Sequence, residues 1–286
     1  MTDASFADLE SVYFETAPGI RLHAKACGPV GAPVLLFIHG FPEFWYAWRA
    51  QLADFSADYR CVALDLRGFN LSSLPLALEA YKPAALGAPL HAVVAHDWGG
   101  ALAWGLVAQF PQLMKKFAVL NAPHTLAFAH ALAHDADQIA ASQYMNWLRR
   151  TGSEAALAQN QFQRLCAFAD LQTEDDKAAY RACWSLGLTG GCNYYRASPL
   201  HPDDPEQAGR MAALAAKLQA GDFRVSIPTQ VIWGTADTAL RPVLLHGLEQ
   251  QVADLRVHRV EGAGHWLART HAKEVNGVLR SFLEEH

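Results

Sequence analysis

Short apolar runs alternate along the chain with stretches in which apolar residues recur every three to four positions. The run 33–38, Pro-Val-Leu-Leu-Phe-Ile, is continuous, as is typical of a strand buried on both faces. Trp45, Trp48 and Leu52 have the spacing of an amphipathic helix. This alternation predicts a mostly parallel, twisted sheet flanked by helices. The expected strands are 11–15, 20–26, 33–38, 59–64, 91–95, 114–120, 229–233 and 255–260.

One long region departs from this alternation. Residues 125–221 are rich in Ala, Gln, Leu and aromatic side chains and contain no apolar run of strand type. We therefore expect a helical cap there, inserted in an α/β core made of residues 1–124 and 222–286. The helices expected in the core are 45–55, 101–110, 242–251 and 273–284.

The connection that leads into the fifth expected strand is short. Residues 81–91 hold too few positions for a full helix, whereas a parallel crossover usually takes a dozen or more residues with a helix. We expect either an abbreviated crossover, which leaves one sheet face thinly covered, or a chain that lacks a segment. An exposed apolar face would favour a partner subunit, so a homodimer is one expectation.

Composition narrows the classes of function. The 286 residues carry a net charge of −5, with a pI of about 6.2, and this gives no reason to expect nucleic acid or a membrane surface as a partner. The five cysteines show no CxxC spacing, so we expect neither a disulfide framework nor a zinc site. The acidic N-terminus lacks a signal pattern, and no apolar stretch reaches the roughly 20 residues of a membrane helix. These features predict a cytoplasmic protein.

The pattern around Asp97 predicts a nucleophile. Residues 93–100 read Val-Val-Ala-His-Asp-Trp-Gly-Gly, so that an apolar run ends in a small residue and a carboxylate precedes two glycines. This is the pattern of a nucleophile elbow, a strained turn from strand to helix at which small neighbours avoid collision. Serine is the commoner nucleophile there. A carboxylate instead attacks saturated carbon and forms an alkyl ester.

Two further residues complete a catalytic pattern. Asp237 follows the strand 229–233 in Gly-Thr-Ala-Asp-Thr, and His265 follows the last strand in Gly-Ala-Gly-His-Trp. The order nucleophile, acid, histidine is that of α/β-hydrolases, with each group at the carboxyl end of a different strand. We expect His265, oriented by Asp237, to activate the water that cleaves the ester.

Five motifs resemble those of the epoxide hydrolases of the α/β-hydrolase fold. They are His39-Gly-Phe-Pro, Arg67-Gly-Phe-Asn, His96-Asp-Trp-Gly-Gly, Asn121-Ala-Pro-His and Gly264-His-Trp. The resemblance covers nearly the whole chain and extends into the cap, at Gly-Gly-Cys-Asn-Tyr-Tyr-Arg-Ala (190–197). It implies that Tyr195, and by a looser match Tyr144, hydrogen-bond the epoxide oxygen and donate a proton as the ring opens.

The resemblance also implies the other roles at the site. The backbone N–H groups of Phe41 and Trp98 would form the oxyanion hole for hydrolysis of the ester. The substrate would be a small organic epoxide, and neither a metal nor an organic cofactor is required. Glu43 and His124 are weaker candidates for supporting roles. The residues expected around the substrate pocket are His39, Trp98, Trp147 and Trp266.

Three alternatives use the same fold. In a haloalkane dehalogenase, Trp98 and Trp147 could donate to a halide, but many such enzymes carry Asn after His-Gly, where this chain has Phe41. Haloacetate dehalogenases hold the substrate carboxylate with arginines just after the nucleophile, where this chain has Trp98 and Ala101. Neither reaction needs paired cap tyrosines, so epoxide hydrolysis is favoured. A non-catalytic ligand-binding protein is disfavoured because such proteins usually lose part of the triad, which is complete here.

Overall fold

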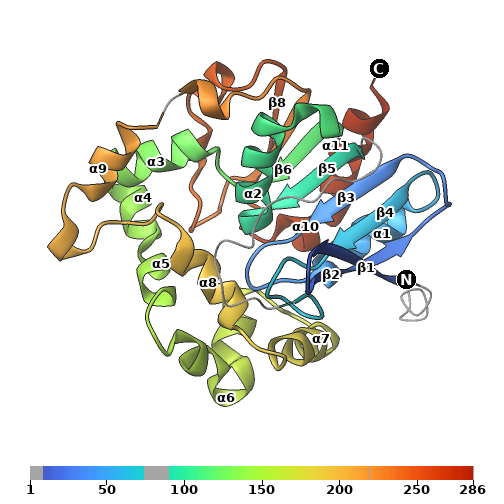
Figure 1. The fold of residues 1–286 in the computed structure, drawn as a ribbon, viewed down its shortest axis with the longest axis horizontal. Coiled ribbons are helices and arrows are strands. Elements are labelled where there is room, and N and C mark those ends of the chain that lie inside the picture. The colour runs from blue at the N-terminus through green and yellow to red at the C-terminus, as the bar shows by residue number, and fades with distance from the viewer. Residues whose placement is uncertain (1–8, 74–89, 219, 286) are drawn as a thin grey trace.

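The computed structural model describes residues 9–73, 90–218 and 220–285, and these contain one mixed sheet of eight strands in the order β1-β2-β4-β3-β5-β6-β7-β8 (Figure 1). Strand β2 runs antiparallel to both β1 and β4, and the remaining pairs are parallel. All eight expected strands are present. Their bounds are β1 Glu10–Ala17, β2 Ile20–Cys27, β3 Val34–Ile38, β4 Arg60–Leu64, β5 Leu90–His96, β6 Met114–Leu120, β7 Thr229–Gly234 and β8 Leu255–Val260.

The central strand β5 is buried on both faces of the sheet. Val93 and Ala95 pack in the core on the side of α2 (Asp97–Gln109), whereas Ala92 and Val94 pack on the opposite side, against α1 (Arg49–Phe55) and α11 (Ala272–Glu284). All four side chains are inaccessible to water. Alternate residues of a strand point to opposite faces, so a continuous apolar run covers both layers of helices. Helix α11 confirms the helix expected at 273–284.

The prediction of a helix at 242–251 is wrong. Two short 3-10 turns, η7 (Pro242–Leu245) and η8 (Leu248–Gln250), occupy this stretch instead. Gly247 between them has φ +75°, a left-handed conformation that an α-helix cannot contain. Leu244, Leu245 and Leu248 are buried, so the apolar spacing correctly indicated burial but not the type of helix. Two other bounds differ slightly: a 3-10 turn, η2 (Trp45–Trp48), precedes α1, and α2 begins at Asp97 instead of position 101.

Between β6 and β7 the chain is helical. In Figure 1 these helices form an arc that begins beside the sheet and extends beyond its end. The described residues of 125–221 contain no strand. The helices are α3 Thr125–His134, α4 Ala136–Ala141, α5 Gln143–Leu148, α6 Ser153–Phe168, α7 Glu174–Trp184, α8 Thr189–Ala197 and α9 Arg210–Ala215, with 3-10 turns η5 Pro205–Gln207 and η6 Ala220–Phe223.

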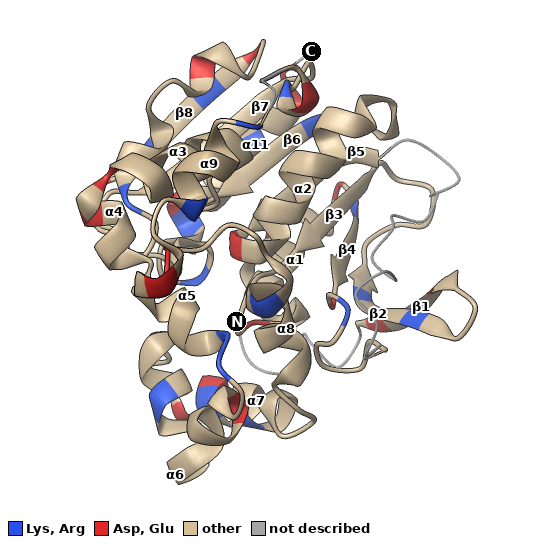
Figure 2. Cartoon of the chain, turned by 60° about the vertical axis from the view of Figure 1, so that its left-hand side comes forward, with Lys and Arg blue, Asp and Glu red and all other residues tan. Residues whose placement is uncertain are grey.

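Acidic and basic residues lie interspersed on the helices around the sheet (Figure 2). Within the described ranges, none of the helices combines the length and the apolar character needed to cross a membrane. The short connection expected at 81–91 lies outside the described residues up to position 89, and positions 90 and 91 already belong to β5.

Candidate active site

Asp97 occupies the turn from β5 to α2 in a strained backbone conformation. Its φ is +50°, a region that costs energy for any residue with a side chain. The glycines near Asp97 are needed because other parts of the chain lie very close to them. A Cβ on Gly99 would lie 2.4 Å from the carbonyl oxygen of Ile38. A Cβ on Gly40 would lie 2.2 Å from Oδ1 of Asp97. The carboxylate therefore rests directly on the loop that follows β3.

Three loops bring the predicted nucleophile, histidine and acid together. His265 Nδ1 lies 2.7 Å from Asp237 Oδ2, and His265 Nε2 lies 3.6 Å from Asp97 Oδ2. The other oxygen of Asp97, Oδ1, accepts a hydrogen bond of 2.8 Å from the backbone N–H of Phe41. The backbone N–H of Trp98 belongs to the first turn of α2, where N–H groups have no partner within the helix.

The two carboxylates favour the charged form of His265. Desolvation opposes that charge, but the charge and hydrogen bond of Asp237, followed by those of Asp97, raise the pKa of His265 to about 10. Desolvation likewise disfavours the charge of Asp237, yet the charge of His265 and the amides of Ala239 and Leu240 lower the pKa of Asp237. At neutral pH the imidazole is therefore held protonated between two carboxylates.

Asn121, which the sequence analysis left without a role, orients the acid. Its Nδ2 donates to Asp237 Oδ2 at 2.7 Å, and its Oδ1 accepts from the N–H of Gly234 at 2.8 Å. The N–H groups of Ala239 and Leu240 donate to Oδ1 of Asp237, each at 2.9 Å. The available signal was the motif Asn121-Ala-Pro-His directly after β6.

Tyr144 and Tyr195 come from α5 and α8, and their rings pack edge to face. Their ring centroids are 6.1 Å apart, and the ring of Tyr195 meets Trp98 edge-on at 5.0 Å. Desolvation raises the pKa of both phenols, and the negative charge of Asp97 raises it further. Both groups are thus kept protonated close to the carboxylate, as a proton donor must be.

A cavity of about 320 Å³ lies between these groups. Asp97, Trp98, Tyr144 and Tyr195 line it, and most of the other lining residues are apolar. Such a chamber suits a small, largely apolar molecule. Within the part of the chain that the structure describes, no three His, Cys, Asp or Glu side chains are grouped to hold a metal ion.

The remaining predicted pocket residues lie elsewhere. Trp147 lines a neighbouring cavity, and Trp266 packs on His265 at 4.6 Å without lining either cavity. His39 also lines neither, because its fully buried ring is held behind the loop: Nδ1 contacts the carbonyl of Gly40 at 2.8 Å and Nε2 accepts from Leu66 N–H at 3.0 Å. Of the four expected pocket residues, His39 and Trp266 are therefore the two that line neither cavity.

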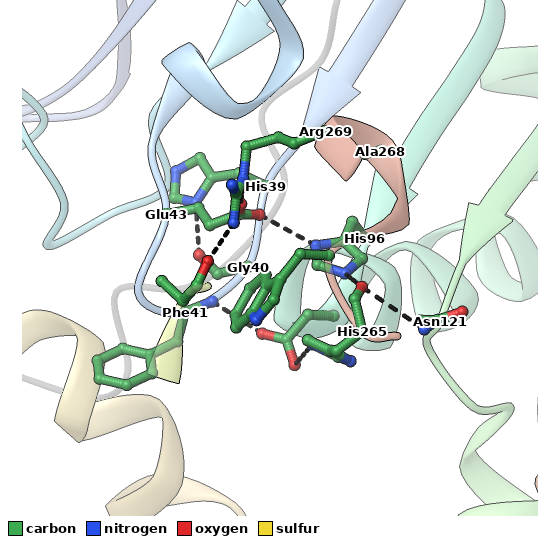
Figure 3. Close-up of polar contacts among 12 residues, drawn as sticks. His39, Gly40, Phe41, Glu43, His96, Asn121, His265, Ala268 and Arg269 are labelled. Carbon is green, nitrogen blue, oxygen red and sulfur yellow. Dashed lines mark hydrogen bonds and ion pairs between the residues drawn. The ribbon is translucent and has the colours of Figure 1, made fainter. Parts of the chain in front are cut away.

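A buried charge network lies behind the site (Figure 3). Glu43 accepts from Arg269 Nε at 3.0 Å and from the hydroxyl of Tyr180 at 3.2 Å, and its second oxygen lies 3.1 Å from His96 Nδ1. His96 Nε2 in turn lies 2.9 Å from the carbonyl oxygen of His265. Desolvation opposes the charge of Glu43, but His96 and Arg269 lower its pKa to about 2. No motif pointed to Arg269.

The segment after His265 is also hydrogen-bonded to the C-terminal end of α6. Trp266 Nε1 donates to the carbonyl of Phe168 at 2.8 Å, and Arg269, on α10 (Leu267–Thr270), donates to the carbonyl of Ala169. Both acceptors lie at the end of α6. The ring of Phe168 lies 6.2 Å from that of Tyr144, so this tether connects the histidine loop to one of the tyrosines.

Comparison with known proteins agrees with this fold and geometry. A model of the alpha/beta hydrolase fold matches residues 33–272, and the chain belongs to this family. Within the family it groups with epoxide hydrolases. Epoxide hydrolase 1 of Caenorhabditis elegans is 32% identical over 93% of this chain and 69% of the relative, and epoxide hydrolase 3 of Xenopus tropicalis is 32% identical over 93% and 76%.

The solved structures to which this chain is similar also include epoxide hydrolases. The epoxide hydrolase of Bacillus megaterium in complex with an inhibitor is 29% identical, with a TM-score of 0.82 over 96% of this chain and 100% of the other. An epoxide hydrolase from metagenomes of hot environments is 32% identical, with a TM-score of 0.82 over 97% and 99% of the two chains.

Proposed function

We propose that the protein hydrolyses small organic epoxides to vicinal diols through an alkyl ester on Asp97. The observation that carries this proposal is the placement of the Asp97 carboxylate on the same cavity as two protonated phenols, Tyr144 and Tyr195, with His265 behind it. A dehalogenase would have no use for two proton donors beside the leaving atom.

The ring-opening step follows from the contacts of the two oxygens of Asp97. Oδ1 is bound by the N–H of Phe41 and becomes the carbonyl oxygen of the ester, which leaves Oδ2 to attack the epoxide carbon. As the carbon–oxygen bond of the ring breaks, the departing alkoxide takes a proton from Tyr195 or Tyr144. A phenol of ordinary pKa is a stronger acid than the alcohol that forms, so either tyrosine is a suitable proton donor to the departing alkoxide.

Formation of the ester prepares the second step. The ester carries no charge, so His265 loses the interaction with Asp97 that helps to raise its pKa and becomes a better proton donor. The proton that it releases replaces the one that the tyrosine gave to the alkoxide. Neutral His265 then takes a proton from water, and the hydroxide attacks the ester carbonyl carbon, whose developing oxyanion is bound by the N–H groups of Phe41 and Trp98. Collapse breaks the bond between the carbonyl carbon and the ester oxygen, and the proton of the added hydroxyl passes to the departing oxygen. This releases the diol and restores the carboxylate, while His265 keeps the proton that it took from water.

Replacing His265 tests the ester directly. In the His265→Gln variant, attack by Asp97 should proceed, but no base remains to activate water. Incubation with styrene oxide should therefore give a protein whose mass is increased by one substrate molecule, with the added mass on the peptide that contains Asp97. Steady diol formation without added mass would contradict the ester. Halide release from bromoalkanes by the wild type, with epoxides left untouched, would favour the dehalogenase alternative.

Removal of one phenolic hydroxyl tests the proton donors. Tyr195→Phe is expected to lower kcat for styrene oxide by about 10²-fold, because general acid assistance to the departing oxygen is lost. Tyr194→Phe is the matched control: this neighbour donates to the carbonyl of Arg67 at 3.1 Å and should leave kcat close to the wild-type value. Equal kcat values for the two variants would remove Tyr195 from the mechanism.

The same proposal assigns residues 125–221 as a cap and residues 1–124 and 222–286 as the core. Both tyrosines come from the proposed cap, whereas Asp97, Asp237 and His265 come from loops after strands of the core. We further propose a cytoplasmic location, which is supported by five cysteines that are all free thiols, as is usual in a reducing compartment.

A further inference from the structure

A second cavity beside the active site differs from the first in its charge. It has a volume of about 340 Å³ and is lined by aromatic and leucine side chains together with Arg164. Tyr144 and Phe41, both part of the proposed catalytic machinery, belong to this lining, and Tyr144 also lines the first cavity. The second cavity therefore borders the reaction centre and shares the wall formed by Tyr144 with the first. Asp97 is the charged residue of the first cavity, and Arg164 is that of the second.

Arg164 differs from the paired arginines around it. Arg149, Arg181, Arg196 and Arg210 each lie within 4.0 Å of an aspartate or glutamate. For Arg164 the described residues supply neither a carboxylate at ion-pair distance nor a hydrogen-bond acceptor. Its guanidinium carbon lies 5.9 Å from the centroid of the Trp147 ring. The side chain is exposed, so an anion can reach it from solvent.

We propose that the second cavity receives a substrate substituent that ends in a carboxylate, and that Arg164 is a specificity-determining residue for such epoxides. A guanidinium matches a carboxylate in shape and can donate two parallel hydrogen bonds to it. The apolar walls hold the chain that connects the carboxylate to the oxirane, and Trp147 orients the guanidinium by a cation–π contact. The inference rests on the proposed epoxide hydrolysis and adds to it the class of substrate.

Occupation of both cavities would also orient the oxirane. An apolar substituent on one ring carbon fits the first cavity, whose lining apart from Asp97 is mostly apolar, and the carboxylate chain on the other carbon extends past Tyr144 towards Arg164. The charge of the two substituents, as well as their size, would then determine which ring carbon faces Asp97. The preferred substrate is thus an epoxide that is apolar at one end and anionic at the other.

A pair of matched substrates tests this inference. One is an epoxide with phenyl on one carbon and a carboxybutyl chain on the other, and its partner is the methyl ester of the same acid. For the wild type we expect kcat/KM for the acid to exceed that for the ester by about fivefold, the upper range for a solvent-exposed ion pair, and to fall towards the ester value at high salt. Arg164→Met should abolish the preference without changing kcat/KM for the ester, and Arg164→Glu should reverse it.

The control variant is Arg259→Met, which removes one positive charge from an exposed residue of β8 and should keep the preference for the acid. Equal kcat/KM values for acid and ester in the wild type, or an equal loss on both substrates in Arg164→Met, would overturn the inference while the proposed function stands. The inference would also be overturned if the wild type hydrolysed styrene oxide but neither the carboxybutyl epoxide nor its methyl ester. Failure of the wild type on all three epoxides would overturn the proposed function and this inference with it.

Discussion

Replacement of Asp97 by alanine is expected to lower kcat for epoxide hydrolysis by about 10⁴-fold or more, the size of loss seen when a member of a catalytic triad is removed. Without the carboxylate no ester can form, and neither the tyrosines nor His265 can act as a nucleophile towards the ring carbon. The measurement is the initial rate of diol formation from styrene oxide at saturating substrate, with the fold checked by thermal unfolding.

A second aspartate in the same backbone conformation provides the control. Asp170 also has φ +50°, so Asp170→Ala introduces comparable backbone strain at a residue that lines neither cavity. It should keep kcat near the wild-type value. Asp97→Gly adds a variant that tolerates the left-handed backbone and should be as inactive as Asp97→Ala. More than one hundredth of wild-type kcat in a folded Asp97 variant would exclude Asp97 as the nucleophile.

Replacement of Glu43 by glutamine is expected to lower the free energy of unfolding by about 3–5 kcal/mol, because it removes one partner from a buried ion pair. The side chains of Glu43 and Arg269 are only 2% and 5% exposed, so neither Arg269 nor His96 can regain solvation when the carboxylate is lost. Urea unfolding at neutral pH measures the loss. The comparison variant is Glu154→Gln, whose partner Arg196 is about a quarter exposed and whose loss should cost less than about 1 kcal/mol.

The loss of unfolding free energy in Glu43→Gln should become smaller as the pH falls. The pKa of Glu43 is lowered from 4.5 to about 2 in the folded protein, so its stabilising contribution is complete above pH 4.5 and declines as the pH falls towards 2. The difference between the wild type and Glu43→Gln should therefore shrink on acidification. A difference that is constant from pH 7 to pH 3, or a loss no larger than that of Glu154→Gln, would contradict the assigned network.

The sheet could be predicted because each strand carries its own local signal. Apolar runs of strand length located all eight strands, whereas the error at 242–251 arose because Gly247 interrupts a helical apolar spacing with a positive φ. Asp97, Asp237 and His265 were found by the same local reasoning, since each follows a strand. Their roles as nucleophile, acid and base remain the subject of the predictions above.

The supporting residues could not be predicted in this way. Asn121 and Asp237 are 116 positions apart, and Glu43 and Arg269 are 226 apart, so only the folded chain brings these pairs together. The tyrosines were indicated by resemblance alone, because a tyrosine on a helix has no distinctive spacing. His39 was expected at the pocket because its motif is close in sequence to the oxyanion loop, but its ring points behind that loop.

The tether from Trp266 and Arg269 has a consequence for engineering. Its acceptors are main-chain carbonyls, which every residue type possesses, so substitutions at 168 and 169 should preserve it. A change in length there would shift both carbonyls. Grafting the helices of another hydrolase onto this core should therefore succeed only when the loop length up to position 169 is matched, because the donated helices would otherwise leave the loop of His265 without its support.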